Sequence, residues 1–269
     1  MNFTNNSPNY DIKELKNMFI DVFSEDSRFV DMMFENKLTP DNTFIVKEND
    51  TIISMAYGMY FDCIVNKASG KCVYVYGVAT DKNYRGKGYM TKIMDDIYNH
   101  YKEDKELLFL YLVPASADLF PMYEKLGYET VFYLNRHEYD LSCCDYPAAE
   151  IKSGDFHDDY IIYIKQFDNV IVRSRLDNRL ALKECAYEKV GESGFLYCIN
   201  NDIAYIREAY IYSIDDLRGF LGYLKSKGAH KAILTSKPEK KGNNQPYAMV
   251  KTFQPIDFSG TSYTNINFD

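Results

Sequence analysis

One loop combines the residue types and the spacing best suited to chemistry, residues 84–89 with the sequence YRGKGY. It follows the apolar run CVYVYGVAT and precedes a segment whose apolar residues recur at helical spacing. Glycines let a backbone approach a ligand closely, and the N–H groups of a first helical turn favour an anion. Arg85 and Lys87 add positive charge to an otherwise acidic protein. The loop therefore predicts a phosphate or pyrophosphate site; a tight surface turn with two solvated cations is the alternative.

The elements around this loop predict an α/β domain with a mixed sheet. Apolar spacing predicts two helices, an antiparallel meander of three strands, an amphipathic helix, a buried strand, a short helix and a last strand. The strand, helix and buried strand form a crossover unit, and Pro121 is expected in the first turn of the short helix. The predicted order is ααβββαβαβ, over residues 12–22, 25–35, 43–47, 51–65, 72–80, 90–101, 107–113, 118–126 and 128–138.

The second half of the chain repeats this plan in pattern, though not in residues. We expect a first domain over residues 1–141, a linker over 142–158 and a second domain over 159–269. The second domain is predicted to contain helices, a hairpin, a helix and two strands, at residues 159–166, 174–190, 195–199 with 203–211, 217–227, 230–235 and 247–253. Gly191 is expected to end the helix over 174–190.

The composition argues against several classes of function. The chain has 269 residues and a net charge of −8, which argues against a general nucleic-acid binder, because phosphate contacts need clustered Lys and Arg. No apolar run reaches the roughly 18 residues of a membrane span, and no signal peptide is visible at the N-terminus. The six cysteines form no CxxC pair, and no His stands at ligand spacing. These features predict reduced thiols in the cytoplasm and no metal site.

Residues 78–90, VATDKNYRGKGYM, resemble the acetyl-CoA signature of the GNAT superfamily of N-acetyltransferases, Q/R-x-x-G-x-G/A. Arg85 and Gly88 match the signature, whereas Met90 stands at the sixth position, where Gly or Ala is usual. Residues 110–129, LYLVPASADLFPMYEKLGYE, are similar to the family's fifth strand and following helix. The phrases YGVAT and YRGKG are most similar to the Eis-type branch. That resemblance implies a GNAT fold, with an N-terminal catalytic domain and a smaller, degenerate GNAT-like C-terminal domain.

The resemblance also implies residue roles. The backbone of Val78, Ala79 and Thr80 would hydrogen-bond the pantetheine arm of acetyl-CoA, between diverging fourth and fifth strands. The pyrophosphate would be held by the N–H groups of Arg85, Gly86, Lys87, Gly88, Tyr89 and Met90. Tyr123 would protonate the leaving thiolate as a general acid, a role in reach of a phenol at hydrogen-bond distance. A core aromatic residue is the alternative for Tyr123.

The general base is not evident, because the strand over residues 71–80 carries no Asp or Glu. Tyr74 and Tyr76 could hold a water molecule, and Asp62 lies on the preceding strand. The resemblance to the Eis-type branch adds the C-terminal carboxylate of Asp269 as a candidate.

Together these observations predict a cytoplasmic acyltransferase that moves acetyl from acetyl-CoA to a primary amine by direct attack in a ternary complex. The acceptor is expected to be a small molecule or a peptide, and the acidic balance favours a cationic one. No metal, nucleic acid or membrane partner is expected, and a homo-oligomer is left open. The alternatives are a non-catalytic acyl-CoA-binding or sensing module, motivated by Met90 and the absent carboxylate, and an interaction scaffold that binds no cofactor.

Overall fold

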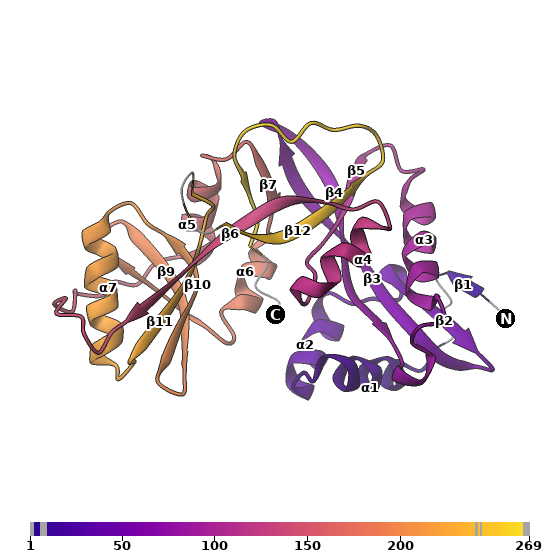
Figure 1. The fold of residues 1–269 in the computed structure, drawn as a ribbon, viewed down its shortest axis with the longest axis horizontal. Helices are drawn as coiled ribbons and strands as arrows, with labels where there is room; N and C mark the ends of the chain where they lie inside the picture. Colours follow the sequence, from indigo (N-terminus) through magenta and orange to yellow (C-terminus); the bar gives the residue numbers. More distant parts are fainter. Residues whose placement is uncertain (1–2, 6–9, 240–241, 243, 266–269) are drawn as a thin grey trace. The chain divides into compact units, whose positions relative to one another are not determined.

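The computed structural model describes residues 3–5, 10–239, 242 and 244–265, and Figure 1 traces the chain. The chain divides into two compact units, each built from segments that are distant in the sequence. The first unit comprises residues 1–62, 70–129 and 249–257. The second comprises residues 63–69, 130–248 and 258–269. The predicted boundaries at residues 141 and 158 stay a prediction.

The first unit has the predicted order from α1 to α4, preceded by the strand β1, whereas the predicted last strand, over residues 128–138, is β6 and lies almost wholly in the second unit. Its elements are β1 (Phe3–Asn5), α1 (Ile12–Phe23), α2 (Ser27–Asn36), β2 (Thr43–Glu48), β3 (Thr51–Val65), β4 (Ala68–Thr80), α3 (Tyr89–Tyr101), β5 (Leu107–Leu112) and α4 (Phe120–Glu124). Short 3-10 turns occupy Pro40–Asn42, Lys82–Tyr84 and Ala117–Leu119. The strand β4 starts at Ala68, earlier than the predicted residue 72, because the hairpin turn is only two residues long.

Local side-chain chemistry sets the ends of these elements. Asp11 caps α1 by accepting a bond from the Lys13 N–H at 2.9 Å, and Asp26 caps α2 in the same way. Asn49 and Asp50, between β2 and β3, both have positive φ, of 50° and 66°. Such a turn matches the twist of the two strands that it joins.

The sheet of the first unit changes from antiparallel to parallel at the centre of the fold. β1, β2, β3, β4 and β5 are neighbours in that order, with β5 parallel to β4. The strand β12 (Asn244–Thr252) comes from much later in the chain, and its residues 249–252 pair antiparallel with β5. The second strand of the crossover unit therefore has a partner on each side.

The helix α3 covers one face of this sheet. Ile93, Met94 and Ile97 are buried in a cluster that includes Leu110 of β5. The C-terminal residue of the helix, Tyr101, donates a hydrogen bond to the carbonyl of Gly58 at 2.9 Å. A Cβ at Gly58 would lie 2.5 Å from the Tyr101 hydroxyl oxygen, so only glycine lets the ring pack against β3.

The second unit is also a mixed sheet covered by helices. Its elements are β6 (Glu129–Asp140), α5 (Phe156–Ile164), β7 (Asn169–Val172), α6 (Arg175–Ala181), β8 (Ala186–Val190), β9 (Ser193–Asn200), β10 (Ile203–Tyr210), α7 (Ile214–Ser226), β11 (Lys231–Ser236) and β13 (Ser262–Tyr263). The sheet order is β6-β11-β10-β9-β8, and β10 and β11 are parallel. On α7, Phe220 stacks on Phe195 of β9 with the ring centroids 4.1 Å apart.

The predicted helix over residues 174–190 is wrong in its second half. The helix α6 ends at Ala181, and residues 186–190 form the strand β8, which pairs with β9. Gly191 has a φ of 57° in the turn between those strands and does not end a helix. Tyr187 and Lys189, two residues apart on the strand, both bond the Asp159 carboxylate at 2.9 Å. These contacts with Asp159 and the pairing with β9 favour a strand, although the apolar spacing of residues 186–190 is helical.

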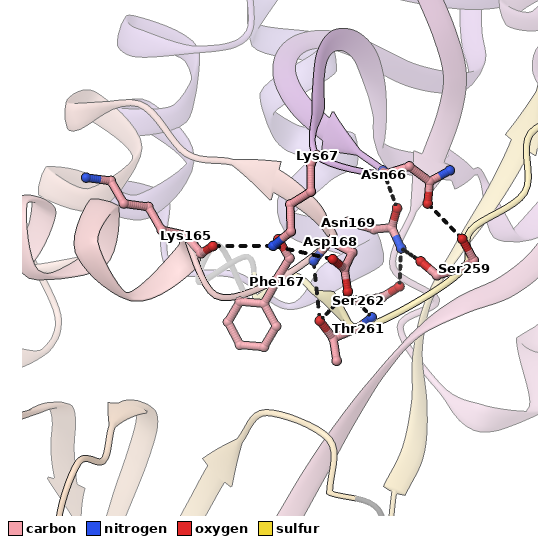
Figure 2. Close-up of polar contacts among 9 residues, drawn as sticks. All are labelled: Asn66, Lys67, Lys165, Phe167, Asp168, Asn169, Ser259, Thr261 and Ser262. Atoms are coloured by element: carbon pink, nitrogen blue, oxygen red, sulfur yellow. Dashed lines mark hydrogen bonds and ion pairs between the residues drawn. The ribbon is translucent and has the colours of Figure 1, made fainter.

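The turn between β3 and β4 belongs to the second unit, and Figure 2 shows its polar contacts there. The Asn66 N–H donates to the side-chain carbonyl of Asn169 at 2.9 Å, and Lys67 Nζ donates to the carbonyl of Phe167 at 2.7 Å. Lys67 also pairs with Asp168 at 3.4 Å. The Asp168 carboxylate in turn accepts from the Thr261 N–H at 2.8 Å. Three segments distant in sequence therefore meet in one hydrogen-bonded cluster.

Candidate active site

The loop before α3 has the backbone geometry of a close-approach site. Gly86 and Gly88 have φ values of 75° and 83°, and Gly88 is the N-cap of α3. Its carbonyl accepts the first helical bond, from the Lys92 N–H at 3.0 Å. Among the described residues, no heavy atom lies within 4 Å of a Cβ built on either glycine. The glycines are needed for the left-handed conformation, and they leave the outer side of the loop clear.

A short turn holds this loop to the sheet. The Asp81 N–H donates to the carbonyl of Ile53 on β3 at 2.9 Å. The Asp81 side chain accepts from the Asn83 N–H at 2.8 Å, and its carbonyl accepts from the Tyr84 N–H at 2.9 Å. Asp81 was not predicted to have a role, although an Asp at the start of a polar loop is a known turn signal.

The two predicted cations lie at the N-terminal end of α3, where the helix dipole favours an anion. Arg85 is exposed and donates from Nε to the carbonyl of Thr80 at 3.1 Å, which orients its guanidinium against the end of β4. Lys87 is also exposed, and its Nζ lies 4.8 Å from the ring centroid of Tyr84. The Tyr84 ring packs edge-on to Tyr89, the first residue of the helix.

The predicted cofactor-binding part of β4 lies beyond its pairing with β5. In the described sheet, that parallel pairing joins Lys71 to Leu107 and Cys72–Tyr74 to Phe109–Tyr111, and on β4 it ends at Tyr74. Gly77 then adopts a φ of 58°, and a Cβ there would lie 2.9 Å from the ring of Phe19. Residues 78–80 follow this irregular position, which is the arrangement expected of strands that diverge.

A buried serine supports the end of β4. The hydroxyl of Ser54, on β3, donates to the carbonyl of Ala79 at 2.7 Å and lies 3.0 Å from the hydroxyl oxygen of Thr80. Val78 and Thr80 are partly exposed, whereas the side chain of Ala79 is buried. Sequence reasoning missed Ser54, and a single small polar residue in an apolar strand is a weak signal for this role.

Tyr123 lies on α4 in the same hydrophobic cluster as Tyr89, and Val78 and Met90 pack against that cluster. Its side chain is 7% exposed, and burial raises the pKa of its hydroxyl to about 12. The hydroxyl is therefore protonated at neutral pH. The ring meets that of Tyr128 edge-on, with centroids 5.9 Å apart. The cluster brings together the start of α3, the end of β4 and the predicted general acid.

The candidates for a general base differ in their surroundings. Tyr74 is buried and stacks on Tyr111 with ring centroids 4.7 Å apart, and Tyr76 is also buried. Asp62 is exposed near the end of β3. Asp269 lies outside the described residues.

Two negative findings apply to the described part of the chain. It contains no group of three or more His, Cys, Asp and Glu side chains placed to hold a metal ion. None of its helices combines the length and the apolar character needed to cross a membrane.

Comparison with known proteins identifies the family. A family model described as an acetyltransferase (GNAT) domain matches residues 6–131. A search of curated protein sequences finds no match. Among solved structures, a GCN5-related N-acetyltransferase from Anabaena variabilis has 14% identity and a TM-score of 0.71, over 90% of this chain and 70% of that one. A second GCN5-related N-acetyltransferase, from Kribbella flavida, has 13% identity and a TM-score of 0.66 over 90% and 69%.

Eis1 from Mycobacterium abscessus is similar at 9% identity, with a TM-score of 0.60 over 90% of this chain and 71% of that one. At these identities the likeness to solved structures shows the fold, and the family rests on the matched domain. The chain therefore carries a GNAT acetyltransferase domain over residues 6–131, just under half of its length.

Proposed function

We propose that the chain transfers acetyl from acetyl-CoA to a primary amine by direct attack in a ternary complex. One observation carries this proposal. The loop before α3 contains two glycines in the left-handed conformation and two exposed cations, and it follows the end of β4, which extends past the pairing of β4 with β5. Bound acetyl-CoA would supply the acetyl group as a thioester, together with a pyrophosphate for the loop and an extended arm for the strand.

The residues present fit such a donor. The N–H groups of residues 85–90 would bind the pyrophosphate, with the dipole of α3 and the charges of Arg85 and Lys87 adding to the attraction. The backbone of residues 78–80 would hydrogen-bond the arm. The carbonyls of Ala79 and Thr80 each accept one side-chain bond already, but a carbonyl oxygen has two lone pairs and accepts a second.

Tyr123 would act on the leaving group from its hydroxyl. Its raised pKa of about 12 keeps the proton on the oxygen, but it also makes the phenol a weaker acid than a thiol of pKa about 8–9. Complete proton transfer to the thiolate is therefore opposed by the difference in pKa. Hydrogen-bond donation to the negative charge that develops on sulfur needs no complete transfer, and we assign that contribution to Tyr123.

On the acceptor side, we propose a cationic small molecule or peptide. The support is the net charge of −8, which attracts cations over distances of about a Debye length. The ammonium form of the acceptor must lose a proton before its nitrogen can attack, and the exposed carboxylate of Asp62 is one candidate to receive it.

The test is a thermal melt of the whole chain with and without acetyl-CoA. At about 100 times its Kd, the ligand should stabilise the fold by about 2.7 kcal/mol and raise Tm by a few degrees. Arg85→Glu should reduce the shift, by about half or more if acetyl-CoA binds at least tenfold more weakly. Lys102→Glu is the matched control, because it reverses a charge of the same sign at the opposite end of α3.

Turnover is measured by release of the CoA thiol in the presence of candidate amines. A melting shift with thiol release supports the proposal. A melting shift with no release across amine classes would favour the sensing module. Wild-type protein with no shift at millimolar acetyl-CoA would refute the cofactor site itself.

A further inference from the structure

Two cysteines of the second unit lie at one end of a strand pair: Cys198 is on β9, and Cys185 immediately precedes β8. β8 and β9 are antiparallel, and their last pair at one end joins Ala186 to Tyr197. One step further along the same register would place Cys185, in the bend before β8, opposite Cys198. Directly opposed residues of antiparallel strands have Cα atoms about 4.5–5.5 Å apart. That spacing falls inside the range of about 4.4–6.8 Å that a disulfide spans.

The two thiols also point to the same face of the sheet. Leu196 is buried in the cluster that lies under α5, whereas Tyr197 belongs to the cluster under α7. Because strand side chains alternate, Cys198 shares the face of Leu196, and Cys185 packs against the same cluster. The thiols are hydrogen-bonded to each other, and both are only partly buried. A small reagent can therefore reach them.

A cation next to the pair makes one thiol the nucleophile. The register between β9 and β10 shifts between Ile206 and Glu208, at the position of Arg207, which hydrogen-bonds Cys198. The bond from Cys185 and the Arg207 guanidinium lower the pKa of Cys198 to about 6, against burial and the Glu184 carboxylate. The same pairing raises the pKa of Cys185. This arrangement favours the thiolate form of Cys198 beside a protonated Cys185.

We propose that Cys198 and Cys185 form a peroxide-reactive pair that closes to an intramolecular disulfide, with Cys198 as the attacking thiol and Cys185 as the resolving one. This activity is separate from acetyl transfer, and its residues all lie within the second unit.

The chemistry balances with a hydroperoxide as the oxidant. The Cys198 thiolate attacks one oxygen of hydrogen peroxide, the O–O bond breaks, and hydroxide leaves and takes up a proton to become water. Cys198 is now a sulfenic acid, oxidised by two electrons. The Cys185 sulfur then attacks the Cys198 sulfur, and the sulfenic hydroxyl leaves with the Cys185 proton as a second water. Two thiols and one peroxide thus give one disulfide and two waters.

The whole purified chain, treated with hydrogen peroxide and digested with trypsin without reduction, tests the proposal. Cleavage after Lys183, Lys189 and Arg207 places Cys185 in the peptide 184–189 and Cys198 in the peptide 190–207. The expected product is these two peptides joined, lighter than their sum by two hydrogen atoms and separated again by dithiothreitol. The double variant Cys143→Ser, Cys144→Ser should form the same link, because these two adjacent thiols do not belong to the proposed pair.

Two further variants examine the assigned roles. In Cys185→Ser, the link should be lost and Cys198 should accumulate as sulfenic or sulfinic acid. In Arg207→Gln, the midpoint of Cys198 alkylation against pH should rise toward the ordinary thiol value of about 8.5. The proposal is overturned if the link is missing at a peroxide dose that oxidises the exposed Cys143. An unchanged alkylation midpoint in Arg207→Gln, with the fold intact by circular dichroism, would overturn the assigned nucleophile.

Discussion

Replacing Tyr123 by Phe removes one hydroxyl from α4 and leaves the ring in place. The side chain is 7% exposed, and its ring packs in the cluster that joins α3 and α4. Phe fills the same space, so the free energy of unfolding should change by less than about 1.5 kcal/mol. The variant therefore separates the chemistry of the hydroxyl from the packing of the ring.

The size of the rate effect follows from the state of that hydroxyl. With its pKa at about 12, Tyr123 is ionised to only about one part in ten thousand at pH 8. Its contribution is a hydrogen bond to developing charge on sulfur, and such bonds are worth about 1.5–3 kcal/mol. That range converts to a loss of kcat of about 10- to 150-fold. The Kd of acetyl-CoA should stay within about twofold.

The assay is CoA thiol release under saturating acetyl-CoA, over a range of pH. Tyr128→Phe is the matched control, because among the described residues the Tyr128 hydroxyl is buried without a hydrogen-bond partner. Deleting that hydroxyl should leave kcat unchanged and the stability equal or higher. If Tyr123→Phe keeps kcat within twofold of wild type, the assigned role is wrong. A fall in wild-type activity near pH 10 that disappears in the variant would contradict the raised pKa.

Four further predictions concern the loop, the strand and the second unit. Arg85→Glu should weaken acetyl-CoA binding at least tenfold by calorimetry, since a charge-assisted bond is replaced by repulsion. Gly86→Ala should lower the free energy of unfolding in urea by about 1–2 kcal/mol, because the alanine would be strained by the positive φ but would meet no neighbouring atom of the described residues. Gly77→Ala should lower the free energy of unfolding by about 1–3 kcal/mol more than Gly86→Ala does, because its Cβ would also overlap a neighbouring ring. Equal losses of stability in the two variants would refute this packing argument. Bonds from the Thr261 backbone and hydroxyl lower the pKa of Asp168 below 3.8. The unfolded chain then binds the proton first, so this stabilisation is present above about pH 4 and is lost as the pH falls. In Asp168→Asn, the free energy of unfolding should therefore fall less steeply than in the wild type as the pH is lowered below about 4.

Local sequence determined most of the first unit. The helices, the meander and the short helix after β5 are where the apolar spacing, the turn residues and Pro121 place them, because each signal acts within a few residues. The loop at residues 84–89 was also predictable, since only glycine adopts its two left-handed positions without strain. The family followed from the same stretch and from the block around Tyr123, and the matched GNAT domain confirms it.

The features that sequence reasoning missed depend on contacts distant along the chain. Residues 186–190 have helical spacing, yet Asp159 and the neighbouring strand make them β8. Residues 249–252 join the first unit by pairing with β5, and no local signal specifies that partner. Ser54 acquires its role only because β3 brings it to the carbonyl of Ala79.

The same distinction separates the two proposed sites. Helix dipole and glycine conformation are local properties, so the cofactor loop could be predicted from residues 84–89 alone. Cys185 and Cys198 are separated by a strand, a turn and most of a second strand, and their spacing carries no recognisable motif. Strand register sets which side chains face one another, and register is decided by burial over the whole sheet. The sequence by itself therefore determined most elements of the first unit and the loop, whereas only the tertiary structure decided that residues 186–190 are a strand, which strands are partners and which thiols meet.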